Sequence, residues 1–180
     1  MAELDEITLE RARRGDRDAF RQLVERYERP VFSVLGRMLY VSGKDSLVDD
    51  LAQETFVRVF RALDTFDTDG RLSSWILTIA TRLAIDELRR PQHTEYLGED
   101  LASDARTDAA SERRNVANAI EGAVATLSPE QRATFLLREV HDFDYEEIAE
   151  ALKVDLGTVK SRLSRARTAL RAALKGIHDE

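Results

Sequence analysis

Apolar residues recur along this chain at intervals of three and four positions, and no stretch alternates apolar and polar residues for long. Such spacing is typical of amphipathic helices, because an α-helix completes a turn about every 3.6 residues. With about 100° advanced per residue, one narrow apolar stripe near the C-terminus is formed by Val159, Leu163, Ala166 and Leu170. The sequence therefore predicts an all-α fold.

Short polar residues indicate where the helices begin. Ser, Thr, Asp and Asn side chains accept hydrogen bonds from the free N–H groups of a first helical turn, and Glu or Gln three residues later completes a capping box. We expect such N-caps at Asp16, Ser46, Ser73, Ser128 and Asp144. Pro91 is expected to end the helix that follows Ser73, whereas Pro30 is expected to kink or split a longer helix.

Charge divides the chain into three segments. Residues 1–92 carry a net charge of −2, residues 93–112 carry −5, and residues 113–180 are neutral overall. The middle segment follows Pro91, is rich in Ala, Asp, Ser and Thr, and lacks apolar periodicity, which is typical of an extended, self-repelling linker. We therefore expect two small helical domains joined by a flexible acidic linker. A loop packed on one domain is the alternative.

Two short helices separated by a tight turn are predicted in the last segment. Ile148 and Val159 face inward from the two helices, and the small Ala149 allows the helices to cross closely. This spacing is that of a helix-turn-helix, whose second helix enters the major groove of DNA. The turn, at 153–155, begins with Lys where such motifs often have Gly, and it ends with Asp155, which is well placed to cap the second helix.

The second of these helices is strongly cationic, although the whole chain carries a formal net charge of −7. Residues 157–175 contain six Lys or Arg and no acidic residue. Opposite the apolar stripe, small hydroxyls alternate with long cations, which suits close approach to phosphates and guanine edges. This face comprises Ser161, Ser164, Arg165 and Thr168, flanked by Lys160 and Arg162. Backbone N–H groups of Gly157 and Thr158 are expected to meet a phosphate. A solvated surface face is the alternative.

The helix expected over 48–63 has an outward face suited to protein docking. Acids, bases and sizeable apolar residues mix there, namely Asp50, Glu54, Val57, Arg58 and Arg61, with Gln53 and Phe60 at the edge. A mixture of this kind is more typical of a protein interface than of a purely solvated surface. An ordinary exposed face with ion pairs four residues apart is the alternative.

Composition argues against most enzymatic chemistry. The chain has no Cys, its three His are far apart, and it contains no glycine-rich phosphate loop or GxSxG motif. No apolar run is long enough to cross a membrane, and the charged N-terminus does not resemble a secretory signal. We expect a cytoplasmic, non-enzymatic protein without metal or cofactor. A helical hydrolase that uses His141 near Asp142 and Asp144 is a remote alternative.

Three stretches together resemble an extracytoplasmic-function (ECF, group IV) sigma factor of bacterial RNA polymerase. In chain order they are DDLAQETFVRVFRALDTFD, SSWILTIATRLAIDELRR and LSPEQRATFLLREVHDFDYEEIAEALKVDLGTVKSRLSRARTAL. The resemblance implies sigma region 2 at 1–92, a linker at 93–112 and region 4 with its helix-turn-helix at 113–180. It also implies binding to the β′ and β subunits of core RNA polymerase, recognition of promoter DNA, and control by an anti-sigma factor. A stand-alone helix-turn-helix transcriptional regulator is the alternative.

The resemblance further assigns residues to three surfaces. The polymerase-binding face comprises Asp49, Asp50, Gln53, Glu54, Val57, Arg58 and Arg61. The −10 surface, which reads and melts the −10 promoter element, comprises Phe66, Asp67, Thr68, Asp69, Gly70, Arg71, Arg82, Arg89 and Arg90. The −35 face, which reads the −35 element, comprises Thr158, Lys160, Ser161, Arg162, Ser164, Arg165 and Arg167. The linker is expected to run near the path of nascent RNA.

Overall fold

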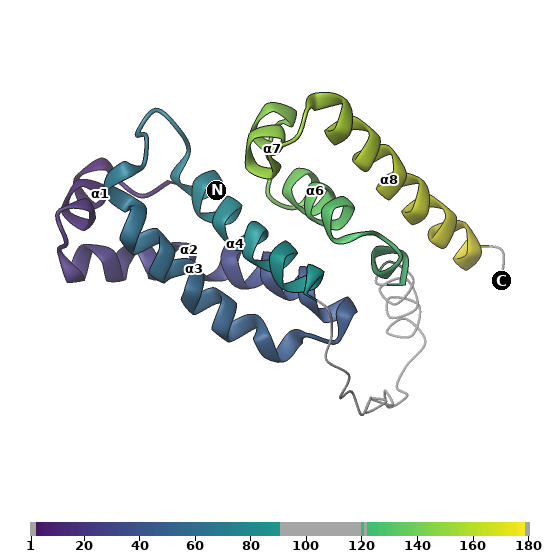
Figure 1. The fold of residues 1–180 in the computed structure, drawn as a ribbon, viewed down its shortest axis with the longest axis horizontal. Coiled ribbons are helices and arrows are strands. Elements are labelled where there is room, and N and C mark those ends of the chain that lie inside the picture. The colour runs from purple at the N-terminus through teal and green to yellow at the C-terminus, as the bar shows by residue number, and fades with distance from the viewer. Residues whose placement is uncertain (1–2, 91–119, 121, 179–180) are drawn as a thin grey trace.

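The computed structural model describes residues 3–90, 120 and 122–178, so the linker predicted at 93–112 lies outside the described residues. Regular structure within these ranges is entirely helical, as predicted. The N-terminal domain contains α1 (Glu6–Arg13), α2 (Arg17–Leu39), α3 (Val48–Ala62) and α4 (Leu72–Arg89). The C-terminal domain contains α6 (Pro129–Glu139), α7 (Tyr145–Leu152) and α8 (Leu156–His178) (Figure 1).

Helix α2 lies at the centre of the N-terminal domain and packs against α1, α3 and α4. Its core-facing side chains, Leu23, Tyr27, Val31 and Leu35, recur every four residues and are fully buried. Burying one such apolar side chain away from water contributes about 1.5–3 kcal/mol to the free energy of unfolding. Pro30 does not split α2, because the side chains before and after it are buried in the same core and hold the two halves in one helix.

Four of the six expected caps are confirmed, and three of these four lie before α2, α6 and α7. These three are Asp16, Ser128 and Asp144, the last two as complete capping boxes. The expected caps at Ser46 and Ser73 are wrong. A 3₁₀ turn, Asp45–Leu47, leads directly into α3, and no side chain caps the helix. Ser73 lies one residue inside α4, where it is buried and its hydroxyl donates a hydrogen bond to the carboxylate of Glu3.

The C-terminal domain contains the predicted helix-turn-helix. Buried Ile148 of α7 and buried Val159 and Leu163 of α8 belong to one core with side chains of α6. Lys153 closes α7 in the left-handed conformation, with φ 52° and ψ 52°, which usually favours glycine. The carboxylate of Asp155 accepts the N–H of Thr158 at 2.7 Å, which confirms the expected cap of α8.

The two domains pack against each other. Helices α6 and α7 contact α4, and α6 also contacts α2. Figure 1 shows α7 and α6 beside α4, with α8 on the side of the C-terminal domain that faces away from the N-terminal domain. The helices predicted to bind DNA therefore differ in accessibility. Helix α4 is contacted by the C-terminal domain, whereas α8 lies away from the N-terminal domain.

Candidate polymerase and DNA interfaces

The centre of the −35 face lies on the exposed side of α8. Its stripe of Val159, Leu163 and Ala166 is buried, which fixes the rotation of the helix about its axis. The opposite side is exposed, and it carries Lys160, Ser161, Ser164 and Arg165. Two hydroxyls and two cations therefore share one open helical surface, as major-groove binding requires.

The flanking members of the −35 face are less free. Thr158 donates both its N–H and its hydroxyl to Asp155, so the phosphate contact expected from this N–H is occupied by the helix cap. Arg167 pairs with Glu139 at 2.7 Å across to α6. Arg162 is partly buried and lines a crevice between α8 and the C-terminal end of α4. These three flanking positions can support the central residues, but they are less available to bind DNA.

The polymerase-binding face is exposed or half-exposed along α3, while Ala52, Thr55 and Val59 on the other side are buried. Glu54 and Arg58 form an ion pair at 2.7 Å, one helical turn apart. An ordinary solvated face would also show such an ion pair, so the pair does not by itself indicate a protein interface. Phe60, at the edge of the face, remains 52% exposed, which is unusual for a side chain of this size on a purely solvated surface.

Most of the loop in the −10 surface is open to solvent. Asp67, Thr68, Asp69 and Gly70 are exposed and form a tight turn in which the N–H of Gly70 donates to the carbonyl of Asp67 at 3.0 Å. Phe66 differs from the prediction. Its ring is 94% buried and lies 5.2 Å from that of Trp75, because an apolar ring at the loop's first position anchors it to the core. Phe66 therefore supports the loop rather than presenting its ring to DNA.

Three of the four arginines of the −10 surface contact the C-terminal domain. The Nε of Arg82 donates to the carbonyl of Ala151 at 2.7 Å, at the C-terminal end of α7. Arg71 lies 3.5 Å from the carboxylate of Glu147. A third contact joins Arg89 to Glu130 at 2.6 Å, whereas Arg90 pairs with Glu87 within its own domain. The family resemblance assigns these cations to DNA, and nothing in the sequence indicates their carboxylate and carbonyl partners.

One buried arginine links the two domains more deeply. Arg132 of α6 is 3% exposed, and its guanidinium donates to the carbonyl of Met38 at 2.5 Å and to the hydroxyl of Ser42 at 3.2 Å. It also reaches the carbonyl of Leu127, and burial lowers its pKa. Sequence reasoning missed this residue. The available signal was a charged side chain one turn before Leu136, on the apolar face of α6.

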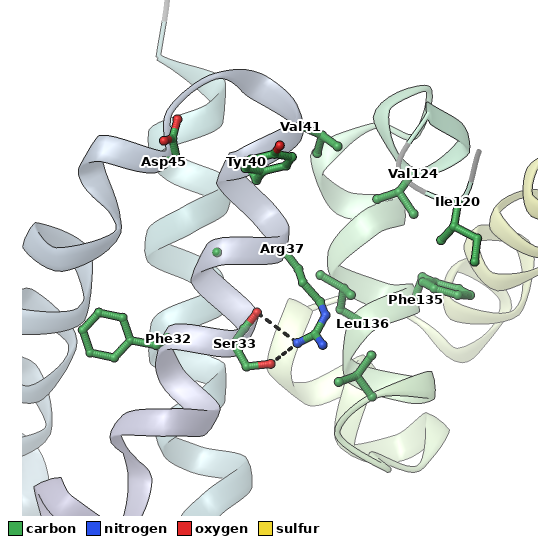
Figure 2. Close-up of a pocket in the computed structure, with 12 residues that line it drawn as sticks. Phe32, Ser33, Arg37, Tyr40, Val41, Asp45, Ile120, Val124, Phe135 and Leu136 are labelled. Atoms are coloured by element: carbon green, nitrogen blue, oxygen red, sulfur yellow. Dashed lines mark hydrogen bonds between the residues drawn. The ribbon is translucent and has the colours of Figure 1, made fainter. Parts of the chain in front are cut away.

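A groove of about 710 Å³ runs between α2 and the C-terminal domain (Figure 2). Its walls are mostly apolar, and they include Phe32 and Tyr40 on one side and Val124, Phe135 and Leu136 on the other. In Figure 2, Arg37 extends from α2 toward α6 and donates to the hydroxyl and carbonyl of Ser33. Side chains of both domains therefore form the groove.

The arrangement of titratable side chains around His141 gives no support to the hydrolase alternative. Burial and the nearby charge of Arg37 lower the pKa of His141 to about 4, although Asp142 acts in the opposite direction. Among the described residues, 3–90, 120 and 122–178, no three His, Asp or Glu side chains gather as a metal site would require. The helices in these ranges are also all too short or too polar to span a bilayer.

Comparison with known proteins covers both domains. Residues 23–94 match the family described as Sigma-70 region 2, and residues 117–170 match Sigma-70, region 4. The chain is 29% identical over 182 residues to the ECF RNA polymerase sigma factor SigW of Bacillus subtilis, covering 94% of this chain and 96% of that protein. It is 33% identical over 179 residues to the ECF RNA polymerase sigma-E factor of Escherichia coli, covering 92% of each.

Two solved structures are similar over most of the chain. CnrH, in complex with the cytosolic domain of CnrY, has a TM-score of 0.67 at 27% identity and covers 96% of this chain and 97% of its own. The sigma factor RpoE from Bartonella quintana, in complex with the anti-sigma factor NepR, has a TM-score of 0.58 at 25% identity, with coverages of 87% and 96%. Sequence matches, helical fold and helix-turn-helix agree: this chain belongs to the extracytoplasmic-function family of RNA polymerase sigma factors and is an alternative sigma factor.

Proposed function

We propose that this sigma factor binds core RNA polymerase through the polymerase-binding face of α3 and contacts promoter DNA through the −10 surface and the −35 face. The observation that carries this assignment is the presence of two exposed surfaces of different chemistry in one chain. The face on α3 mixes acids, bases and apolar groups, whereas the face on α8 combines hydroxyls with cations. The first suits a protein partner and the second suits DNA.

At the −35 element, α8 lies in the major groove. Arg165 has the length and the donors to reach a guanine edge, while Ser161 and Ser164 permit close approach and form hydrogen bonds to bases or phosphates. The buried stripe on the opposite side of α8 holds these side chains in register. The chain's overall negative charge gives little nonspecific attraction to DNA, so tight promoter binding depends on the polymerase.

At the −10 element, the exposed turn at 67–70 captures an unstacked base of the non-template strand. Arg71 and Arg82 hold the backbone of that strand, and Arg89 and Arg90 hold the adjoining duplex. Unstacking a base costs a few kcal/mol, which capture by the loop and these phosphate contacts offset. The polymerase performs the chemistry, and this chain supplies recognition and strand opening.

An anti-sigma factor is the expected regulator. The relative from Bartonella quintana was solved with one, NepR, and its chain is similar to this one over both domains. A regulator of this kind would act by denying the sigma factor its polymerase or its promoter. A candidate protein that binds this chain without reducing its binding to core polymerase or to promoter DNA would not fill that role.

The direct test combines core RNA polymerase, this chain and a random DNA library. Recovered promoters should share two elements, and the chain should start transcription from them only together with core polymerase. Arg61→Glu reverses a charge on the polymerase-binding face and should weaken binding to core at least tenfold. Arg29→Glu, at another exposed position, on α2, is the matched control and should leave that binding unchanged.

Two results would favour the stand-alone regulator instead. One is specific DNA binding by the free chain that core polymerase does not alter. The other is a chain that neither binds core polymerase nor changes initiation when it is added. Equal binding of core polymerase by the Arg61→Glu and Arg29→Glu proteins would reject only the assignment of the polymerase-binding face.

A further inference from the structure

We propose that Glu3 is a positioning residue for the −10 surface, because its carboxylate caps the start of α4 from the other end of the domain's sequence. The inference rests on the function proposed above and deepens it. The turn at 67–70 can capture an unstacked base only while the first turn of α4, directly after it, is held in place. The proposal comes from hydrogen bonds that join the N-terminal segment to α4 across 70 positions of sequence.

Helix α4 begins without a cap from its own stretch of sequence. Arg71, the residue before it, has an extended backbone, and its side chain makes no capping hydrogen bond. Helices α1, α2, α6 and α7 are instead each capped by the side chain directly before them. The first N–H groups of a helix have no partner inside the helix, so those of α4 need an acceptor from elsewhere.

Glu3 supplies this acceptor. One of its carboxylate oxygens accepts the N–H of Ser73, in the first turn of α4, at 3.2 Å, and the other accepts the hydroxyl of the same residue. Ser73 is buried, so loss of Glu3 would leave two of its polar groups without a partner, which costs free energy. The negative charge of Glu3 also complements the partial positive charge at the start of a helix.

Tyr27 of α2 holds the carboxylate of Glu3 in this position. Its hydroxyl donates to Glu3 at 3.0 Å and accepts the N–H of Leu4 at 3.0 Å. The ring is fully buried, and burial raises the pKa of the phenol to about 12, so the hydroxyl keeps the proton that it donates. Asp5 caps α1 directly after this segment. Glu3 is therefore fixed between a buried side chain and the start of a helix.

The loop of the −10 surface ends at the turn that Glu3 caps. Phe66 packs beside Trp75 at one end of the loop, and Arg71 leads into α4 at the other. If the first turn of α4 unwinds, the second attachment is lost, and fewer molecules hold the turn at 67–70 ready for a base. The apparent affinity for the −10 strand falls in proportion to that fraction. The polymerase-binding face and the −35 face lie on other helices and should keep their affinities.

Two measurements on the full chain test this inference. The variant is Glu3→Ala, and the matched control is Glu6→Ala, which removes the same charge from an exposed position three residues along. Hydrogen exchange at the first turn of α4 in the free chain reports the cap itself. Binding of a single-stranded −10 oligonucleotide, taken from a selected promoter, to the complex with core polymerase reports recognition. Affinities for core polymerase and for a −35 duplex are measured alongside.

Glu3→Ala should speed exchange in the first turn of α4 and weaken binding of the −10 oligonucleotide, each roughly two- to thirtyfold, as expected for loss of a helix cap. Glu6→Ala should match the parent. Glu3→Gln, whose amide oxygen still accepts hydrogen bonds, should retain most of the affinity. The affinities for core polymerase and the −35 duplex should not change, which separates positioning from a general loss of structure.

Three results would overturn the inference. They are equal exchange in Glu3→Ala and Glu6→Ala, faster exchange with unchanged binding of the −10 oligonucleotide, and losses of equal size for that oligonucleotide and the −35 duplex. A parent complex that shows no preference for the −10 oligonucleotide over an unrelated strand would instead contradict the proposed function.

Discussion

Two helices of this protein are assigned to promoter DNA, and they differ in how much of their DNA-binding side is free. Helix α8 packs on its own domain through one stripe and leaves Lys160, Ser161 and Arg165 exposed. Helix α4 has neighbours on several sides, and three of the arginines that should meet DNA, Arg71, Arg82 and Arg89, are bound by the other domain. The comparison separates a surface that is open to solvent from one whose cations already have partners within the chain.

The two helices also differ in sequence in a way that matches this contrast. The first part of α8 has a narrow apolar stripe, whereas half of the residues in α4 are buried, including Ile76, Ala80 and Thr81 on adjoining sides. A helix that is apolar over much of its circumference is normally covered by more than one neighbour. The broad apolar surface of α4 therefore indicates that this helix packs against a second neighbour.

The largest effect is expected from Arg132, the buried link between the domains. Arg132→Met leaves the buried carbonyls of Met38 and Leu127 without their donor and should lower the free energy of unfolding by about 2–4 kcal/mol. Urea unfolding measures this, with Arg29→Met as the exposed control. Equal unfolding curves for the two variants would show that Arg132 does not join the domains.

On the exposed helix, Arg165→Ala should weaken promoter binding by the polymerase complex by about 1–3 kcal/mol, because a contact with a guanine edge is lost. The salt dependence of binding should also become shallower. Arg14→Ala removes the same charge from an exposed site on the other domain and is the control. No loss of affinity together with an unchanged salt slope would reject the assignment of Arg165.

A smaller effect should follow pH. The pKa of His141 is about 4 in the folded protein, below its ordinary value of 6.5, because of burial and the nearby Arg37. Between these values the unfolded chain binds more protons, so the contribution to stability is complete above about pH 6.5 and declines as pH falls toward 4. Urea unfolding at pH 7.5 and pH 5 should detect this. His141→Gln should flatten the decline, and an undiminished decline in that variant would contradict the account.

Local chemistry explains what could be predicted from sequence. The helices, the helix-turn-helix and the caps at Ser128 and Asp144 follow from periodicity and from side chains within four residues of each other. The wrong caps at Ser46 and Ser73 arose because tertiary contacts override local preference. Ser73 is drawn to Glu3, seventy positions away, and a 3₁₀ turn precedes α3.

The arrangement of the domains could not be predicted in the same way. Glu147 has the ordinary appearance of a capping residue, and Glu130 that of an acid in a first helical turn, so neither indicates that it also binds an arginine of the other domain. The exposed residues of α8 were predictable because their environment is water. The environment of Arg71, Arg82 and Arg89 depends on a contact between elements more than forty residues apart.

The most direct measurement locks the domains together and asks whether the promoter still opens. Thr78 and Glu150 line the cleft between α4 and α7, and Thr78→Cys with Glu150→Cys can be joined by a short bis-maleimide. Permanganate reactivity of unpaired thymines then reports opening of a promoter selected by the polymerase complex. The bridged protein should bind core polymerase but leave the −10 element closed, whereas the same protein capped with a monofunctional maleimide should open it. Equal opening by the bridged and capped proteins would contradict the account.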